Sequence, residues 1–133
     1  VYDPSGDGTE RDSEAPNAID DDPATGWRTE RYFSPLPALK DGVGLTFTVG
    51  GRPAALEIIA TPETRFEIGW AEETPSISTG WQPIASGTTL DGVNVIQLPD
   101  RGGGVWLLWL TDLPELAESE FRSTVFEVTF RSG

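Results

Sequence analysis

The residues best suited to chemistry in this 133-residue chain are three consecutive aspartates, Asp20, Asp21 and Asp22. Adjacent carboxylates repel one another weakly in a solvated loop, and a bound dication would turn that repulsion into attraction. Oxygen donors with no nitrogen or sulfur ligands nearby favour Ca²⁺ over transition metals. The alternative is a loop that is simply solvated, which is the usual state of a charged run. Charge alone leaves both interpretations open.

The chain contains no cysteine and no histidine, which removes several kinds of chemistry. Without cysteine it has no disulfide, thiolate metal site or thiol nucleophile; without histidine it has no Ser-His-Asp triad and no imidazole ligand for zinc. Nine Lys and Arg stand against 22 Asp and Glu, so the net charge is -13. Nucleic acid and anionic membranes are therefore poor partners, whereas hard cations such as Ca²⁺ are good ones.

A second acidic segment, residues 3–10, contains Asp3, Asp7 and Glu10 among glycines. It partly resembles an EF-hand calcium loop, but the twelve-residue spacing and the terminal Glu are absent. A Gly/Asp turn that ties down the N-terminus is the favoured alternative to a second metal site.

The rest of the chain must supply the elements that position these groups. The first forty residues are rich in Pro, Gly and Asp, which indicates loop and not helix. From residue 43 onward, apolar segments are bounded by Gly or Pro, a pattern typical of short strands. These segments are 43–49, 56–58, 65–70, 93–98, 105–110 and 125–130. The only helix we expect is a single turn around Pro114–Ser119.

Short strands at this spacing predict one all-β domain, residues 1–133, and a two-sheet antiparallel jelly-roll β-sandwich fits best. Residues 105–110 are apolar at every position, so their strand needs cover on both faces and is expected to be central. In the last strand Phe126, Val128 and Phe130 share one face. Glu127 then lies mid-strand on the other face, where a buried carboxylate would need a partner.

Residues 17–27 read Asn-Ala-Ile-Asp-Asp-Asp-Pro-Ala-Thr-Gly-Trp. This segment resembles the opening motif of the galactose-binding-like superfamily, the discoidin-type and related carbohydrate-binding β-sandwiches. The sequence departs from the motif at Asp21, where the family usually has Gly, and we expect a positive φ there, which Asp tolerates better than most residues. The resemblance implies a structural Ca²⁺ whose ligands would be Asp20, Asp22, Thr25, backbone carbonyls near Asn17 or Ala18, and Glu127.

Longer stretches resemble the C-terminal extracytoplasmic domain of actinobacterial MviN-type proteins, membrane proteins related to the lipid II flippase. The stretches are residues 3–10, 25–32, 107–114 and 126–128. The resemblance implies a non-catalytic module at the cell surface, excised here from a larger parent protein in the plasma membrane but not itself embedded in the bilayer. Its partner would be peptidoglycan, another surface glycan or a cell-wall synthesis protein.

For a sugar-binding surface we look first at Arg28, Arg31, Tyr32 and Phe33, because an aromatic ring beside arginine donors can hold sugar hydroxyls. The favoured alternative is that both arginines pair with Glu30 and its acidic neighbours while Tyr32 and Phe33 cap the sandwich.

The tryptophans divide into two groups. Trp27, Trp106 and Trp109 lie in strand-like apolar contexts and are expected in the core, where large aromatic side chains are most often found. For Trp70 and Trp81 the sequence leaves both a place in the core and a role as a ligand platform open.

Three classes of function remain. A glycosidase would need a carboxylate pair, such as Asp20 with Glu127 or Glu63 with Glu67, about 5–9.5 Å apart and with one raised pKa. Lys40 is the only candidate amine for covalent catalysis. We predict instead a non-catalytic extracytoplasmic module that recognises a glycan or cell-wall component and has a structural calcium site. A protein-docking or spacer domain without sugar binding is the alternative.

Overall fold

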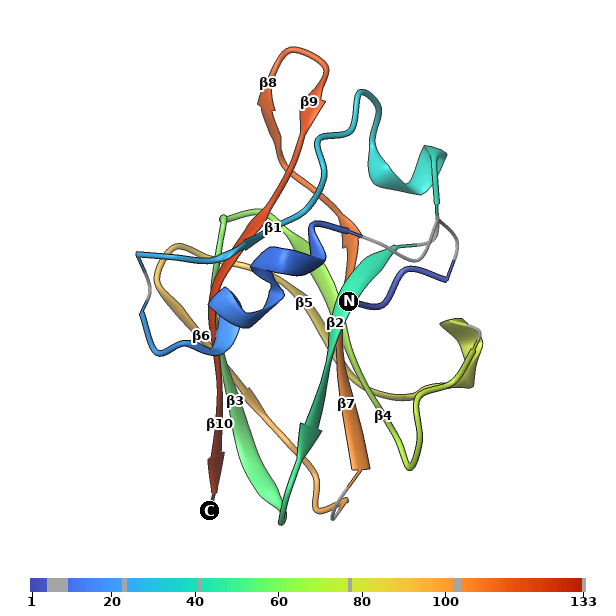
Figure 1. Ribbon diagram of the computed structural model, residues 1–133, viewed down its shortest axis with the longest axis vertical. Helices are drawn as coiled ribbons and strands as arrows, with labels where there is room; N and C mark the ends of the chain where they lie inside the picture. Colours follow the sequence, from blue (N-terminus) through green and yellow to red (C-terminus); the bar gives the residue numbers. More distant parts are fainter. Residues whose placement is uncertain (5–9, 23, 41, 77, 102–103, 133) are drawn as a thin grey trace.

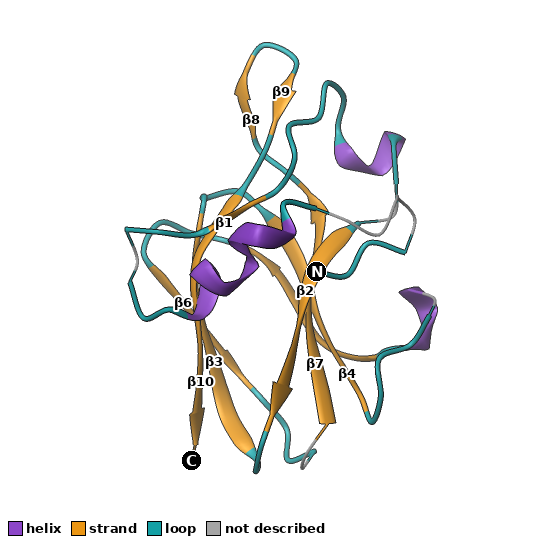
Figure 2. Cartoon of the chain, in the orientation of Figure 1, coloured by secondary structure: helices purple, strands orange, loops and turns teal. Residues whose placement is uncertain are grey.

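The computed structural model describes residues 1–4, 10–22, 24–40, 42–76, 78–101 and 104–132. Two antiparallel sheets of four strands each form a β-sandwich (Figures 1 and 2). The first, the β10 sheet, has the order β1 (Trp27–Arg28), β10 (Thr124–Ser132), β3 (Pro53–Ala60) and β6 (Val93–Gln97). The second, the β7 sheet, has the order β2 (Val43–Val49), β7 (Gly104–Asp112), β4 (Arg65–Ala71) and β5 (Gln82–Thr88).

Smaller elements lie around this sandwich. A hairpin of β8 (Glu115–Ala117) and β9 (Glu120–Phe121) projects from one end (Figure 1). Three short 3-10 helices complete the described part of the chain: η1 (Asp12–Ile19), η2 (Leu36–Ala38) and η3 (Ser78–Gly80). None of the described helices has the length and apolarity needed to cross a membrane.

The core lies between the two sheets and is built from the alternating residues that the sequence pattern indicated. Phe66 and Ile68 of β4 and Trp106, Leu108 and Leu110 of β7 are buried in it. Strand β7 lies between β2 and β4, so its predicted central place is confirmed. Of the tryptophans expected in the core, Trp27 and Trp106 lie in it and are 0% and 1% exposed, whereas Trp109, 6% exposed, is buried in a separate cluster on the other face of β7.

Two secondary-structure predictions were wrong. The turn of helix expected at Pro114–Ser119 is the β8–β9 hairpin, whose turn is closed by Ser119 at φ 57°. The helix η1 lies within the segment expected to be loop. It is held by burial of Ala18, which is 0% exposed, and by packing against β1 and β10. Tertiary packing thus overrides the weak local preference of a segment that contains Pro16.

The face of Phe126 was also predicted wrongly. A bulge between Val125 and Glu127 shifts the register of β10 against β3. Because a bulge inserts one residue into the alternation, Val125 and Val128 both reach the core, and Phe126 does not. Glu127 lies mid-strand outside the core, as the sequence pattern predicted, and is only 8% exposed.

Candidate functional site

Three parts of the molecule are candidates for a functional site: the acidic loop at residues 20–26, an arginine-rich surface beside η1, and a cleft on the outer face of the β7 sheet.

The acidic loop is folded tightly by its own side chains. Asp21 adopts φ 62°, which confirms the positive φ expected at this position. The Asp20 carboxylate accepts hydrogen bonds from the Asp22 backbone N–H, at 3.0 Å, and from the Thr25 hydroxyl. The Asp22 carboxylate accepts the backbone N–H of Ala24 at 3.0 Å, while the Asp22 carbonyl oxygen lies 3.1 Å from the Thr25 hydroxyl.

A glycine brings the end of this loop onto the last strand. A Cβ at Gly26 would lie 2.8 Å from the carbonyl oxygen of Val125 and 2.8 Å from the Thr124 side chain, so only glycine allows this approach. The Asn17 side-chain amide donates to the Gly26 carbonyl over 3.3 Å. Together these contacts place the loop beside Glu127.

The Glu127 carboxyl is buried against the loop. Burial raises its pKa, the charges of Asp20 and Asp21 raise it further, and hydrogen bonds from the backbone of Asp21 and Asp22 partly offset the rise. Its Oε1 has no hydrogen-bond partner among the described residues. The pKa of Asp20 is lowered, chiefly by the hydrogen bond from Thr25. A buried carboxylate oxygen without a partner, next to further oxygen atoms, fits a hard cation.

The described residues contain no group of three acidic side chains placed to hold a metal. A calcium ion here would therefore need the Thr25 hydroxyl and backbone carbonyls such as that of Asp22, in addition to Asp20 and Glu127. The Asp22 carboxylate, which the sequence resemblance offered as a ligand, does not form such a group with Asp20 and Glu127.

Beside η1 the structure separates the four residues considered as a sugar platform. Arg28 forms an ion pair with Glu14, not with Glu30, and its Nε lies 3.0 Å from Glu14 Oε1. Arg31 lies over the ring of Phe33, 5.5 Å from the ring centroid, and Phe33 is 69% exposed. Tyr32 is only 9% exposed. Of the four, Arg31 and Phe33 are the pair that remains open to a ligand.

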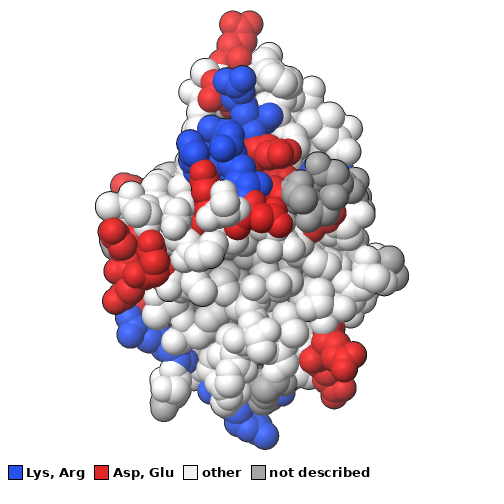
Figure 3. Space-filling view, in the orientation of Figure 1, with Lys and Arg blue, Asp and Glu red and all other residues white. Residues whose placement is uncertain are grey.

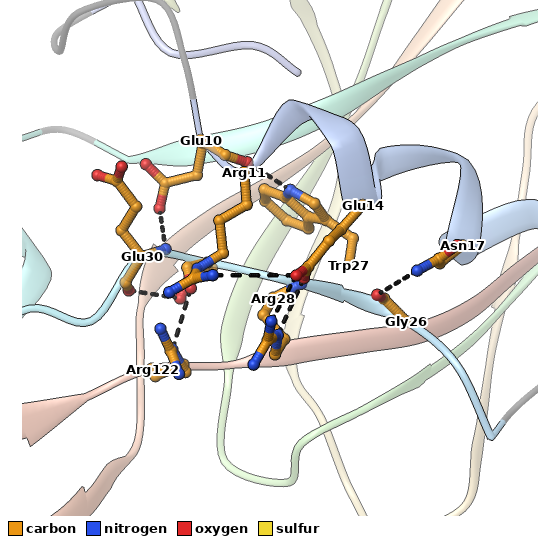
Figure 4. Close-up of polar contacts among 10 residues, drawn as sticks. Glu10, Arg11, Glu14, Asn17, Gly26, Trp27, Arg28, Glu30 and Arg122 are labelled. Carbon is orange, nitrogen blue, oxygen red and sulfur yellow. Dashed lines mark hydrogen bonds and ion pairs between the residues drawn. The ribbon is translucent and has the colours of Figure 1, made fainter.

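Tyr32 belongs instead to a buried network around Glu10. Its hydroxyl donates to the Glu10 carboxylate over 2.7 Å, and the backbone N–H of Glu30 donates to the same carboxylate over 2.6 Å. The Trp27 indole donates to the Glu10 carbonyl oxygen over 2.7 Å (Figure 4). Burial raises the pKa of Glu10, and the hydrogen bonds from Tyr32 and the Glu30 backbone partly offset the rise.

Lys40 completes this network. Its ammonium lies 2.8 Å from Asp3 Oδ1 and 3.7 Å from Glu10 Oε1, and 5.3 Å from the centroid of the Tyr32 ring. The two described carboxylates of the second acidic segment thus face a lysine, while Asp7 lies outside the described residues. The sequence alone did not reveal this use of Lys40, because the lysine is thirty residues beyond Glu10.

Arginines gather near this network although the chain is strongly acidic. Arg11 and Arg28 both contact Glu14, and the side chain of Arg122 donates to the Thr29 carbonyl over 3.1 Å (Figure 4). Figure 3 shows a group of basic side chains on one face of the molecule, with acidic side chains among them. Burial and the charges of the other arginines lower the pKa of Arg122.

The third feature is a cleft of about 560 Å³ on the outer face of the β7 sheet. Here Glu67 of β4 lies between Trp109 of β7 and Ser86 of β5 in the strand register. In the next row Gly69 lies between Leu107 and Pro83. Thr79 of η3 and Trp81 also line the cleft.

Aromatic packing builds one wall of this cleft. Tyr2 contacts Trp81 and Trp109 edge-on, with ring centroids 5.4 and 5.5 Å away. Trp81 lies against Gly69, where a Cβ would be 3.0 Å from that of Trp81. The sequence signal for this wall was the run in β7 that is apolar on both faces; what it could not show was that Tyr2 and Trp81 provide the outer cover.

Solved structures similar to this chain are carbohydrate-binding β-sandwiches. The module CpGH89CBM32-6 produced by Clostridium perfringens has 16% identity and a TM-score of 0.60, covering 94% of this chain and 90% of that one. The CBM32 of AlyQ, solved with 4,5-unsaturated mannuronic acid, has 13% identity and a TM-score of 0.63, covering 94% and 91%. Chitosan-binding module 2 from the chitosanase/glucanase of Paenibacillus sp. IK-5, solved with chitotriose, has 17% identity and a TM-score of 0.58, covering 90% and 86%.

Other similar segments belong to longer glycoside hydrolase chains, of which this chain covers 22% and 14%. No protein-family model matches the chain. At these identities the likeness concerns the fold, which is the galactose-binding-like, two-sheet antiparallel β-sandwich predicted from the sequence.

Proposed function

We propose that this chain is a non-catalytic glycan-binding module and that its cleft on the β7 sheet is the sugar site. The observation that carries the proposal is the lining of this cleft: Trp81 and Trp109, 8% and 6% exposed, lie in it together with the carboxylate of Glu67 and the hydroxyls of Thr79 and Ser86. Sugar rings present apolar C–H faces and a rim of hydroxyls, which match such a mixture. The volume also lies within the range of about 300–1,000 Å³ typical of small-molecule sites.

The fold supports the same proposal. Modules of this architecture include the AlyQ CBM32 and the chitosan-binding module described above, each solved with a sugar. The Arg31 and Phe33 pair offers a second, smaller surface of arginine and aromatic ring. A sugar held there would leave the cleft empty, so variants can separate the two surfaces.

A structural calcium ion is part of the proposal. Asp20, Thr25, the carbonyl oxygen of Asp22 and Glu127 would hold it, with further backbone carbonyls of the loop. The ion would supply positive charge between carboxylates that otherwise repel, and it would fasten the acidic loop to β10. The orphaned Oε1 of Glu127 is the observation that favours this use of the loop.

A catalytic role has less support. The carboxylates of Asp20 and Glu127 are better explained as ligands of a cation. Of the other candidate pair, Glu63 lies in the β3–β4 turn at φ 67°, whereas Glu67 lies within β4.

We place the module outside the cytoplasm, on a membrane-anchored parent involved in cell-wall biogenesis, because of the extended resemblance to MviN-type domains. A docking or spacer domain would keep the fold and bind no sugar.

Binding of purified protein to a panel of chitin, chitosan, alginate and peptidoglycan oligosaccharides tests the proposal, with calorimetry as the readout. In the variant Ser86→Tyr a ring on exposed β5 would fill the cleft, and we expect binding to be lost. Thr48→Tyr places the same ring at the exposed position 48 of β2 in the same sheet, away from the cleft lining, and should bind as the wild type does. Phe33→Ala should also leave binding intact; if Phe33→Ala removes binding and Ser86→Tyr does not, the sugar site lies beside η1 instead.

A further inference from the structure

Glu67 is the one charged side chain among the described residues that line the cleft. It is exposed, it lies mid-strand, and no ion pair involves it within the described part of the chain. Strand register places it directly opposite Trp109 on one side and Ser86 on the other. Side chains that face each other in this way lie within about 5.5 Å at Cβ, so carboxylate, indole and hydroxyl share one small surface.

The surroundings of Glu67 leave its charge uncompensated. Arg65 lies on the same face of β4, two residues away, but it is in register with Asp112 of β7, which supplies an acidic neighbour. No Lys or Arg of the described residues lines the cleft. The whole chain carries a net charge of -13, so the field around the cleft also favours cations over anions.

The aromatic wall adds to this preference. Indole rings attract cations, and Trp81 and Trp109, 8% and 6% exposed, line the cleft beside Glu67. An occupant that brings a cation and an apolar ring face would fit the carboxylate and the adjoining indoles together.

We infer that the cleft takes an amino sugar with a free, protonated amino group, whose ammonium contacts Glu67 and whose ring lies against the tryptophan wall. This inference rests on the proposed glycan-binding function and names the class of sugar for that same site. An N-acetylated sugar has no charge to offer Glu67. A uronic acid would bring a second negative charge to it.

The test compares oligomers of glucosamine with N-acetylglucosamine oligomers of equal length, by calorimetry at about pH 5.5 and about pH 9. An amine with a pKa near 8 is charged at the first pH and mostly neutral at the second, whereas the acetylated oligomer is neutral at both. We expect the glucosamine oligomer to bind at least about tenfold more tightly at the lower pH, and to lose most of this advantage at the higher pH.

Two charge-matched variants make the result specific. Glu67→Gln should reduce binding of the glucosamine oligomer about tenfold and leave the acetylated oligomer unchanged. Glu57→Gln removes an equal charge from a half-buried position of β3 in the other sheet, where Glu57 pairs with Arg131 over 3.3 Å, and should have no effect on sugar binding. Equal losses in both variants would mean attraction by net charge alone and would overturn the inference.

The remaining outcomes distinguish a failure of the amino-sugar assignment from a failure of the proposed glycan-binding function. If neutral or acidic oligosaccharides bind as well as the glucosamine oligomer, and Glu67→Gln has no effect, the amino-sugar assignment is wrong and glycan binding stands. If no oligosaccharide binds at either pH, both the assignment and the proposed function are wrong.

Discussion

The hydroxyl of Tyr32 donates to the carboxylate of Glu10 over 2.7 Å, inside the protein. Glu10 is fully buried, and it precedes η1, whereas Tyr32 follows β1. This single contact therefore joins the N-terminal segment to the edge of the β10 sheet. It also accounts for a polar aromatic residue that looked from the sequence like a candidate for sugar stacking.

We expect Tyr32→Phe to lower the free energy of unfolding by about 1–3 kcal/mol, because it deprives a buried carboxylate of a donor. Tyr2→Phe is the matched control: its hydroxyl donates to the neutral carbonyl of Pro75 over 2.9 Å, and its loss should cost less, about 0.5–1.5 kcal/mol. Urea unfolding measures both. Sugar binding by Tyr32→Phe should equal that of the wild type, and a selective loss of binding with unchanged stability would instead support direct contact with the sugar.

Calcium should stabilise the folded protein, because a ligand that binds only the native state adds RT ln(1 + [L]/Kd), about 2.7 kcal/mol at one hundred times Kd. Thermal melts with calcium and with a chelator measure this. Glu127→Gln should abolish the difference, since it removes the charge of the buried carboxyl against the loop. Glu120→Gln, also in the C-terminal part of the chain but away from the loop, should retain it. Melts that are identical with and without the chelator would rule the ion out.

Acidification should weaken that calcium binding at a higher pH than for an ordinary carboxylate. The pKa of Glu127 is raised by burial and by the neighbouring aspartates, so protons compete with the ion as the pH falls through this raised value. Calcium titrations between about pH 4 and pH 8 measure the effect. An affinity that stays constant across this range would show that Glu127 is not a ligand.

The ion pair of Glu14 with Arg28 should contribute to the fall in the free energy of unfolding at acidic pH. The hydrogen bond from Arg28 lowers the pKa of Glu14 from 4.5 to about 2. A lowered pKa contributes stability that is complete above 4.5 and is lost as the pH falls through about 2. Glu10 and Glu127 act in the opposite sense, because their raised pKa values favour the protonated folded state at low pH.

The variant Glu14→Gln isolates this contribution. It should flatten the fall in unfolding free energy below pH 4.5 and leave the contributions of the two buried carboxyls in place. Urea unfolding over a series of pH values gives the curve. An acid limb unchanged by Glu14→Gln would mean that solvent screens this partly exposed pair too strongly to matter.

The strands could be predicted because strand burial has a period of two, and that period is visible in residues 43–49 and 65–70. The β-bulge at Phe126 could not, because it depends on how β10 pairs with β3. Likewise, η1 is held by packing of Ala18 that no local pattern reveals. The position of Glu127 outside the core could be predicted from the strand period, and the family resemblance singles out the same residue as a calcium ligand, which stays a prediction.

The cleft could not be predicted from the sequence for a different reason. Its wall is formed by Trp81 and Trp109, and Tyr2, which pairs with Gly44 in an isolated bridge, packs against both rings; the three aromatics come from distant segments. Its floor depends on sheet order, since Glu67 meets Trp109 and Ser86 only when β4 lies between β7 and β5. Periodicity gives the face of each residue but not its neighbour across the sheet.

Gly69→Val should test whether the position of Trp81 shapes the cleft. A Cβ at residue 69 would lie 3.0 Å from Trp81 Cβ, so a branched side chain there must push the indole outward. Overpacking of this kind costs about 1–3 kcal/mol, which urea unfolding can measure. Because the displaced ring would occupy the cleft or leave its wall, the affinity for sugar should also fall.

Gly87→Val is the control for crowding, because its added Cβ would lie 3.2 Å from the ring of Phe66. This variant of β5 should lose stability and keep its affinity for sugar. Equal sugar affinity in both variants would show that the wall formed by Trp81 does not contact the ligand.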